Sequence, residues 1–164
     1  MRDSVTRMKY DDASWHSDGE FPATSPVEFG GTHIALMLKW CFLKGWAGEL
    51  HTEDEDSAQD LERLLRGDMS ATEYLFAWCD GKFTDEDLSA EGNAFMLHYY
   101  ERGPYHEDYV QHFGPMYVRP ESEHDFDKFS EMVEARYRAF LAADAIDGLG
   151  PDAPPSRRPW WKFW

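Results

Sequence analysis

The stretch THIALMLKWCFLKGW, residues 32–46, decides the fold of this 164-residue chain. Thr32 follows two glycines and is a good N-cap residue for a helix. Apolar residues then lie almost all round the helix, which leaves only Lys39 and Lys44 for solvent. A helix that is apolar on every side is buried. We therefore expect this segment to be the central core helix and to end near Gly45.

Helical signals recur on the C-terminal side of this core helix. An acidic segment with Glu53–Asp56 at a helix start is expected to end at Gly67. Ser70 with Glu73 caps a short helix whose apolar residues are expected to be buried: Tyr74, Leu75, Phe76 and Trp78. Thr84 with Asp87 is expected to begin another helix. The segment 104–115 is expected to form one or two turns, and residues 116–120 are expected to be a short extended piece before Pro120. Apolar residues repeat at helical spacing over 122–145. The sequence predicts a mainly α fold, a bundle of five or six helices with long irregular loops at the N-terminus and between helices.

Composition indicates one domain with tails. We expect residues 1–8 to be a disordered extension, residues 9–148 to form a single α-helical domain, and residues 149–164 to form a Pro- and Trp-rich C-terminal tail. The chain is long enough to bury one core.

The charge of the chain limits its partners. There are 32 acidic and 16 basic residues, a formal net charge of −16. Such a surface repels phosphate backbones and anionic lipids and attracts cationic proteins, so we expect no nucleic acid and no membrane partner. The apolar run Ile34–Leu38 is far shorter than the ~20 residues of a membrane span. Cys41 and Cys79 lie in apolar helical patterns typical of reduced, buried thiols, and together with the lack of a secretory signal they favour a cytoplasmic protein.

No segment has a catalytic or metal-binding signature. His106 and His112 do not have the HExxH spacing that places two zinc ligands one helical turn apart. Together with His98 they could assemble a metal site in space, but we interpret the three as ordinary surface histidines. The acidic runs lack the glycine and the terminal glutamate of a calcium loop. Phosphate loops, serine elbows and CxxC pairs are also missing. The sequence therefore predicts no catalytic residue, no metal and no cofactor.

Two groups of residues are candidates for partner binding. The first is acidic: Glu53, Asp54, Glu55, Asp56, Asp60, Asp85, Glu86 and Asp87. The second is the tail RRPWWKFW, where Trp160, Trp161 and Trp164 stand among basic residues. Exposed tryptophans typically mark contact sites. Two alternatives stay open for the tail. It either folds back on the acidic body or binds another chain. The oligomeric state stays open too.

The segment KYDDASWHSDGEFP, residues 9–22, places several aromatic residues in a loop. In one interpretation Tyr10, Trp15 and Phe21 are packing anchors, while Asp11 and Asp12 cap a turn. In the other, a pocket is formed by a set of five residues: Asp11, Asp12, Trp15, His16 and His33. That set is the grouping of histidines and carboxylates that we expect to converge on one site.

The same segment carries a resemblance. KYDDASWH at 9–16, Phe21-Pro22 and the helix THIxxxLxW at 32–40 resemble the start of an uncharacterised family of small bacterial proteins. The likeness is specific over residues 8–46 and looser around Leu97–Tyr100 and His106–Tyr109. In size, acidity and aromatic content the chain is also similar to the cytoplasmic immunity proteins that neutralise interbacterial toxins, which is an analogy and not a motif.

Three functions follow as expectations. The leading one is a non-enzymatic acidic protein that binds a cationic partner, most concretely an immunity protein that blocks a co-encoded toxin. The second is a small-molecule-binding protein or enzyme that uses the pocket with Trp15, His16 and His33. The third is a homo-oligomer or scaffold protein joined through WWKFW.

Overall fold

The computed structural model describes residues 7–16 and 21–147, and this part of the chain is mainly helical, as the sequence predicts. Within it there are seven α-helices: α1 Thr32–Leu43, α2 Glu49–Thr52, α3 Glu55–Arg66, α4 Ala71–Trp78, α5 Ala90–Met96, α6 Tyr105–Phe113 and α7 Phe126–Asp147. Two short strands, β1 Lys9–Asp12 and β2 Lys82–Thr84, pair as one sheet. Short helical turns complete the described part: η1 Ala13–His16, η2 Val27–Gly31, η3 Asp85–Asp87, the π-helical η4 Leu97–Glu101 and η5 Glu121–Glu123.

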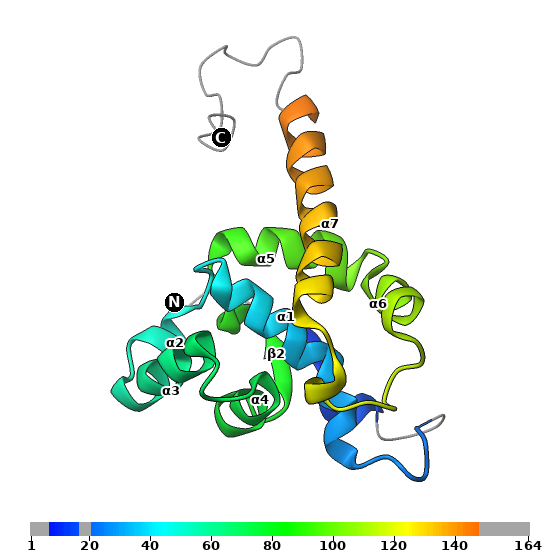
Figure 1. Cartoon of the computed structure of the whole chain (residues 1–164). Helices are drawn as coiled ribbons and strands as arrows, with labels where there is room; N and C mark the ends of the chain where they lie inside the picture. The colour runs from blue at the N-terminus through cyan, green and yellow to red at the C-terminus, as the bar shows by residue number, and fades with distance from the viewer. Residues whose placement is uncertain (1–6, 17–20, 148–164) are drawn as a thin grey trace.

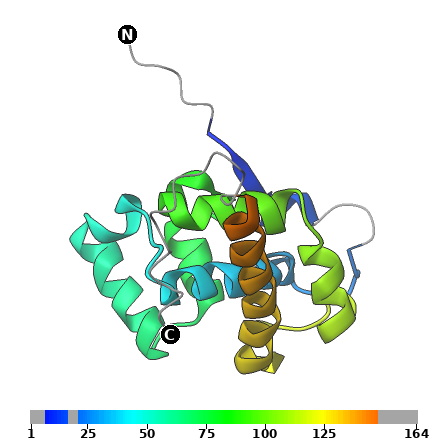
Figure 2. The same cartoon turned by 90° about the horizontal axis from the view of Figure 1, so that it is seen from above.

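Helix α1 lies at the centre of the molecule, with α2, α3 and α4 on one side and α6 on the other (Figures 1 and 2). Nearly all its side chains are buried, as its apolar circumference requires. Trp40 of α1 is 1 % exposed, and its ring contacts the rings of Trp46, Phe95 and Tyr137. Helix α7 therefore packs on the core through the aromatic side chains of its inner face.

The helix ends follow the local signals in the sequence. Asp54 caps α3 by accepting a hydrogen bond from the Ser57 amide, and Gly67 ends it with a φ of 84°. Ser70 caps α4 by accepting from the Glu73 amide. The final amphipathic helix is also present, as the 22-residue α7. These elements are where sequence and structure agree most closely.

Three local predictions are wrong. Thr84 and Asp87 do form a capping box, but it caps the single turn η3 after β2, and α5 begins only at Ala90. The side chain of Phe76, expected in the core, is 38 % exposed. The segment around Tyr117 is a turn and not extended, since Tyr117 has a φ of 70°.

The sheet fixes the N-terminal segment against the middle of the chain. Strands β1 and β2 are antiparallel, with Asp11 opposite Phe83 and a register shift between Lys9 and Asp11. The Tyr10 hydroxyl donates to Asn93 Oδ1 over 2.8 Å, and the Ala13 amide donates to the carbonyl of Gly81 over 2.8 Å. These contacts hold Asp11 in the interior.

The structure also bears on the expectations for the two cysteines, for membrane-spanning helices and for the two ends of the chain. Cys41 is a buried free thiol and Cys79 a partly buried one. Among the helices described, none has the length and apolar character needed to cross a bilayer. The expected extension at 1–8 falls almost entirely, and the tail at 149–164 entirely, outside the described residues.

Candidate functional site

A cluster of polar side chains surrounds the carboxylate of Asp11, which is 2 % exposed. We call it the Asp11 cluster: Asp11 from β1, His16 from η1, His33 from α1, Tyr100 from η4 and His106 from α6. The chain thus brings five separate elements to one point. The sheet supplies Asp11 and the first turn of the core helix supplies His33.

Both oxygens of Asp11 accept several hydrogen bonds. Oδ1 lies 2.5 Å from His16 Nε2 and 2.8 Å from the Asp12 amide. Oδ2 lies 2.9 Å from His33 Nε2 and 3.4 Å from His106 Nε2. The Tyr100 hydroxyl also donates to Oδ2, over 2.6 Å.

The histidines are themselves held by neighbours. His16 Nδ1 bonds to the Tyr117 hydroxyl, and the rings of His16 and His33 meet edge to face with centroids 4.6 Å apart. The Tyr105 hydroxyl donates to the backbone carbonyl of His33 over 2.5 Å. The rings are therefore fixed in orientation, and few rotamers remain open to them.

Burial and hydrogen bonding act in opposite directions on the charge of this cluster. Burial disfavours the ionised carboxylate of Asp11, but hydrogen bonds from His106, His16 and His33 outweigh it and hold the pKa well below its usual range. For His33 burial is the larger effect and lowers the pKa to about 4, despite the attraction of Asp11. Near neutral pH the cluster therefore holds an ionised Asp11 beside a neutral His33.

The lowered pKa of His33 predicts a loss of stability in mild acid. An unfolded histidine binds a proton below about pH 6.5, whereas folded His33 resists protonation down to about pH 4. The unfolded state therefore binds more protons in this window, and stability falls as the pH falls. We compare the free energy of unfolding of the wild type with that of His33→Gln, which has no group that titrates at this position. The difference between the two proteins should shift against the wild type by up to about 2 kcal/mol between pH 7 and pH 5.

Urea unfolding of both proteins at each pH measures this difference, and comparing the two cancels the general effect of the acidic surface. An advantage that stays constant or grows in acid would contradict an interior, neutral His33.

The proposed pocket residues divide into two groups. Asp11, His16 and His33 converge, whereas Asp12 turns back to accept from the Ser14 amide and Lys9. Trp15 does not line a pocket and is not a packing anchor, because it is 56 % exposed with the Lys9 ammonium over its ring. A strand followed by a 3-10 turn sends it to the surface.

Two residues of the cluster could not be predicted from the sequence. The sequence predicts that His106 is an ordinary surface histidine, yet its Nε2 faces Asp11. Tyr100 lies in the range Leu97–Tyr100, where the sequence offers only a loose family resemblance. Both lie about ninety residues from Asp11, and the separation along the chain is 95 for His106 and 89 for Tyr100. No local signal in the sequence points to His106, because it reaches Asp11 only through the packing of α6 near the start of α1.

A second buried cluster joins α2 to the segment after β2. His51 Nε2 lies 2.8 Å from Asp87 Oδ1, and His51 Nδ1 lies 2.7 Å from the Tyr74 hydroxyl. The Thr84 amide donates to Asp87 Oδ2 over 2.8 Å. Burial raises the pKa of the neighbouring Cys79 thiol, which donates to the same carboxylate. This cluster acts as a structural link between two elements, since its polar atoms satisfy one another.

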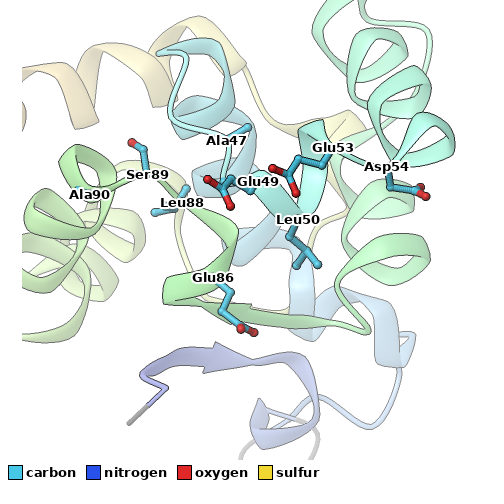
Figure 3. Close-up of a pocket in the computed structure, with 10 residues that line it drawn as sticks. Ala47, Glu49, Leu50, Glu53, Asp54, Glu86, Leu88, Ser89 and Ala90 are labelled. Atoms are coloured by element: carbon cyan, nitrogen blue, oxygen red, sulfur yellow. The ribbon is translucent and has the colours of Figure 1, made fainter. Parts of the chain in front are cut away.

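An open groove lies beside this link, between α2 and the start of α5 (Figure 3). Its volume is about 770 Å³. Backbone contacts join the two segments that line it, because the Gly48 amide donates to the Asp87 carbonyl and Ala47 pairs with Leu88. Gly48 is required here, since a Cβ would lie 2.4 Å from the Glu86 carbonyl oxygen.

The groove is acidic. Glu49, Glu53, Asp54 and Glu86 contribute to its lining, which contains no basic side chain. Figure 3 shows the carboxylates of Glu49 and Glu53 close to the groove, with Asp54 pointing away from them. Within the described part of the chain no ion pair engages Glu49 or Glu53, while Glu86 meets the exposed Arg7 over 3.1 Å.

The acidic residues chosen from the sequence have different environments. Glu53, Asp54 and Glu86 line the groove, and Glu55 and Asp56 are exposed in the first turn of α3. Asp60 accepts from Trp78 Nε1 and from Arg63. The prediction that Asp87 binds a partner at the surface is wrong, because Asp87 is buried by the capping box and by His51. Asp85 is half-buried. Trp160, Trp161 and Trp164 lie outside the described residues.

Comparison with known proteins gives the family of the chain. Residues 9–138 match the family described as "Domain of unknown function (DUF7832)". The chain belongs to the DUF7832 family. The DUF7832 match includes every member of the Asp11 cluster and every residue of the groove. No curated protein and no solved structure shows significant similarity to the chain.

Proposed function

We propose that this DUF7832 protein binds a basic protein partner through the acidic groove, and that it works without catalysis. The observation that carries the proposal is the groove lining, which includes four acidic residues and no basic side chain. Two of them, Glu49 and Glu53, engage in no ion pair within the described part of the chain and place their carboxylates close together (Figure 3). Like charges gathered in one concave surface raise the local potential and attract an oppositely charged partner. The formal net charge of −16 adds a long-range attraction of the same sign.

The groove also has the apolar surface that such a contact needs. Leu50 is 55 % exposed and stands next to the carboxylates of Glu49 and Glu53 (Figure 3). A lysine or arginine of the partner would lay its aliphatic stem on Leu50 and place its charge between the two glutamates. Electrostatic attraction would then set the association rate, and the apolar contact would contribute much of the affinity.

The specific role that we propose is that of a cytoplasmic bacterial immunity protein, which neutralises a co-encoded toxin. What supports it is the combination of a small acidic chain, an acidic groove and an absence of catalytic motifs in the sequence. An immunity protein needs one tight contact with its toxin and no chemistry of its own. The proposal therefore points to the products of the neighbouring genes as the first partners to test.

The test compares two double charge reversals with the wild type. Glu49→Lys with Glu53→Lys places two positive charges in the groove. The matched control, Asp127→Lys with Glu131→Lys, makes the same change of net charge at the same spacing on exposed residues of α7. Calorimetry with each purified basic product of a neighbouring gene measures the affinity.

We expect the groove reversal to weaken binding about 100-fold or more and the α7 reversal to change it less than about 5-fold, because repulsion at close range costs several kcal/mol. The wild-type affinity should also fall as salt rises. Equal weakening by both reversals would show that only net charge matters, and it would exclude the groove as the contact.

A further inference from the structure

We propose that Asp11, His33 and His106 form a binding site for a divalent first-row transition-metal ion such as Zn²⁺, with Asp11 Oδ2 and the Nε2 atoms of the two histidines as ligands. The three ligand atoms lie within 4.8 Å of one another. This site is separate from the acidic groove and does not depend on the binding of a protein partner.

The spacing of the three atoms suits an ion. Tetrahedral zinc with bonds of about 2.1 Å to nitrogen and oxygen separates its ligand atoms by about 3.4 Å. Asp11 Oδ2 lies 3.4 Å from His106 Nε2 and 2.9 Å from His33 Nε2. The Asp11–His106 distance already matches this value, the Asp11–His33 distance would lengthen by about half an ångström, and the two imidazole nitrogens lie within 4.8 Å of each other. Three different elements therefore already bring these side chains to one point.

The crowding at Asp11 Oδ2 also points to a cation. Three groups approach this one oxygen: His33, His106 and the hydroxyl of Tyr100. A carboxylate oxygen has two lone pairs, so one of the three is left without a good acceptor. A cation at this point would accept the lone pairs of the two imidazole nitrogens and would also be attracted by the negative charge of Asp11.

A supporting shell surrounds the proposed ligands. The other oxygen of Asp11 is held by His16 Nε2 and by the Asp12 amide, so the carboxylate is oriented with Oδ2 toward the two histidines. His16 is held in turn by the Tyr117 hydroxyl. Hydrogen-bonded partners of this kind orient ligands in metal sites and increase metal affinity.

The donor set selects the class of ion. Mg²⁺ and Ca²⁺ prefer oxygen ligands, whereas imidazole favours zinc and its first-row neighbours. Three protein ligands leave at least one position for water or another small ligand. The side chain of His106 is 39 % exposed, which gives an ion a route from solvent to the buried Asp11.

The second candidate cluster, His51 with Cys79 and Asp87, is less suited to an ion. Its ligand atoms also lie close together. However, His51 is satisfied on both nitrogens by Tyr74 and Asp87, and the second oxygen of Asp87 caps a turn. An ion would have to break this link. The cluster of His51, Cys79 and Asp87 therefore serves as the comparison site, at which we expect no metal binding.

The experiment titrates the full chain, stripped with a chelator and desalted, with ZnCl₂ in a calorimeter. We expect one ion per chain with a Kd of about 1 µM or tighter. His106→Gln should weaken it at least about tenfold, because it removes one ligand. The matched control is His112→Gln, since His112 lies on the same helix, is exposed, and bonds through Nδ1 only to the Asp108 carbonyl.

Two further measurements complete the design. Co²⁺ in place of Zn²⁺ should give a visible absorption band of a low-coordinate site in the wild type and in His112→Gln, and not in His106→Gln. Cys79→Ser should leave binding unchanged. The proposal is overturned if Zn²⁺ binds more weakly than about 100 µM, if His106→Gln binds as the wild type does, or if Cys79→Ser abolishes binding.

Discussion

Replacement of Asp11 by asparagine is expected to lower the free energy of unfolding by about 3–5 kcal/mol. The substitution keeps the shape of the side chain but removes the charge that accepts hydrogen bonds from His16, His33 and Tyr100. The new amide also carries an NH₂ group, which donates hydrogen bonds where the carboxylate oxygen accepted them. The NH₂ group would therefore face the buried donors of the cluster without an acceptor between them. Leaving buried polar groups unpaired costs about 1–3 kcal/mol each.

Urea unfolding followed by circular dichroism, with a chelator present, measures the Asp11→Asn effect. Asp68→Asn is the control, because Asp68 and its partner Arg66 are both 63 % exposed and such ion pairs contribute little. We expect the control to change stability by less than about 0.5 kcal/mol. A similar, small change in both variants would mean that the Asp11 cluster does not hold the N-terminal segment to the core.

The second large effect is expected at Trp40. Trp40→Ala should destabilise the chain by about 3–5 kcal/mol, as the loss of a large buried aromatic side chain does. The ring stands at the contact of α1 with α5 and α7, and it touches Trp46, Phe95 and Tyr137. The cavity would therefore loosen three elements at once.

The same substitution at an exposed tryptophan is the control for Trp40→Ala. Trp15→Ala removes a ring that is 56 % exposed and contacts the Lys9 ammonium, so we expect a loss of less than about 1 kcal/mol. Chemical unfolding of the two variants gives the comparison. If Trp15→Ala destabilised the chain as much as Trp40→Ala does, the assignment of α1 as the central core helix would fail.

The helices could be predicted because each is coded locally. The apolar circumference of residues 32–43 indicates a buried helix without knowledge of its neighbours, and Asp54, Gly67 and Ser70 act within one turn of their own position. The strands could not be predicted in this way. Each has three or four residues, and they are stable only because they pair across about seventy positions.

The error at Thr84 has a physical cause. A capping box shows that backbone amides need an acceptor, but it does not show how many turns follow. Here the Asp87 carboxylate also accepts from His51, and this contact binds the segment to α2. The tertiary contact ends the turn where local sequence would extend it.

The candidate site was predictable in part for the same reason. Asp11, His16 and His33 lie within one short N-terminal region, so their convergence could be proposed from the sequence. His106 joins them only because α6 packs near the start of α1, and no local pattern records that contact. Trp15 was misplaced because an aromatic residue in a loop looks like an anchor until the strand direction is known.

The measurement that tests the central claim most directly is a capture experiment from lysate of the host with three baits. These are the wild type, the groove reversal Glu49→Lys with Glu53→Lys, and the α7 reversal Asp127→Lys with Glu131→Lys. Mass spectrometry identifies what each bait retains at low and at moderate salt. The account predicts one stoichiometric basic protein on the wild type and on the α7 reversal, eluted by salt and missing from the groove reversal. A wild-type bait that retains no basic protein, or a partner retained equally by the groove reversal, would contradict it.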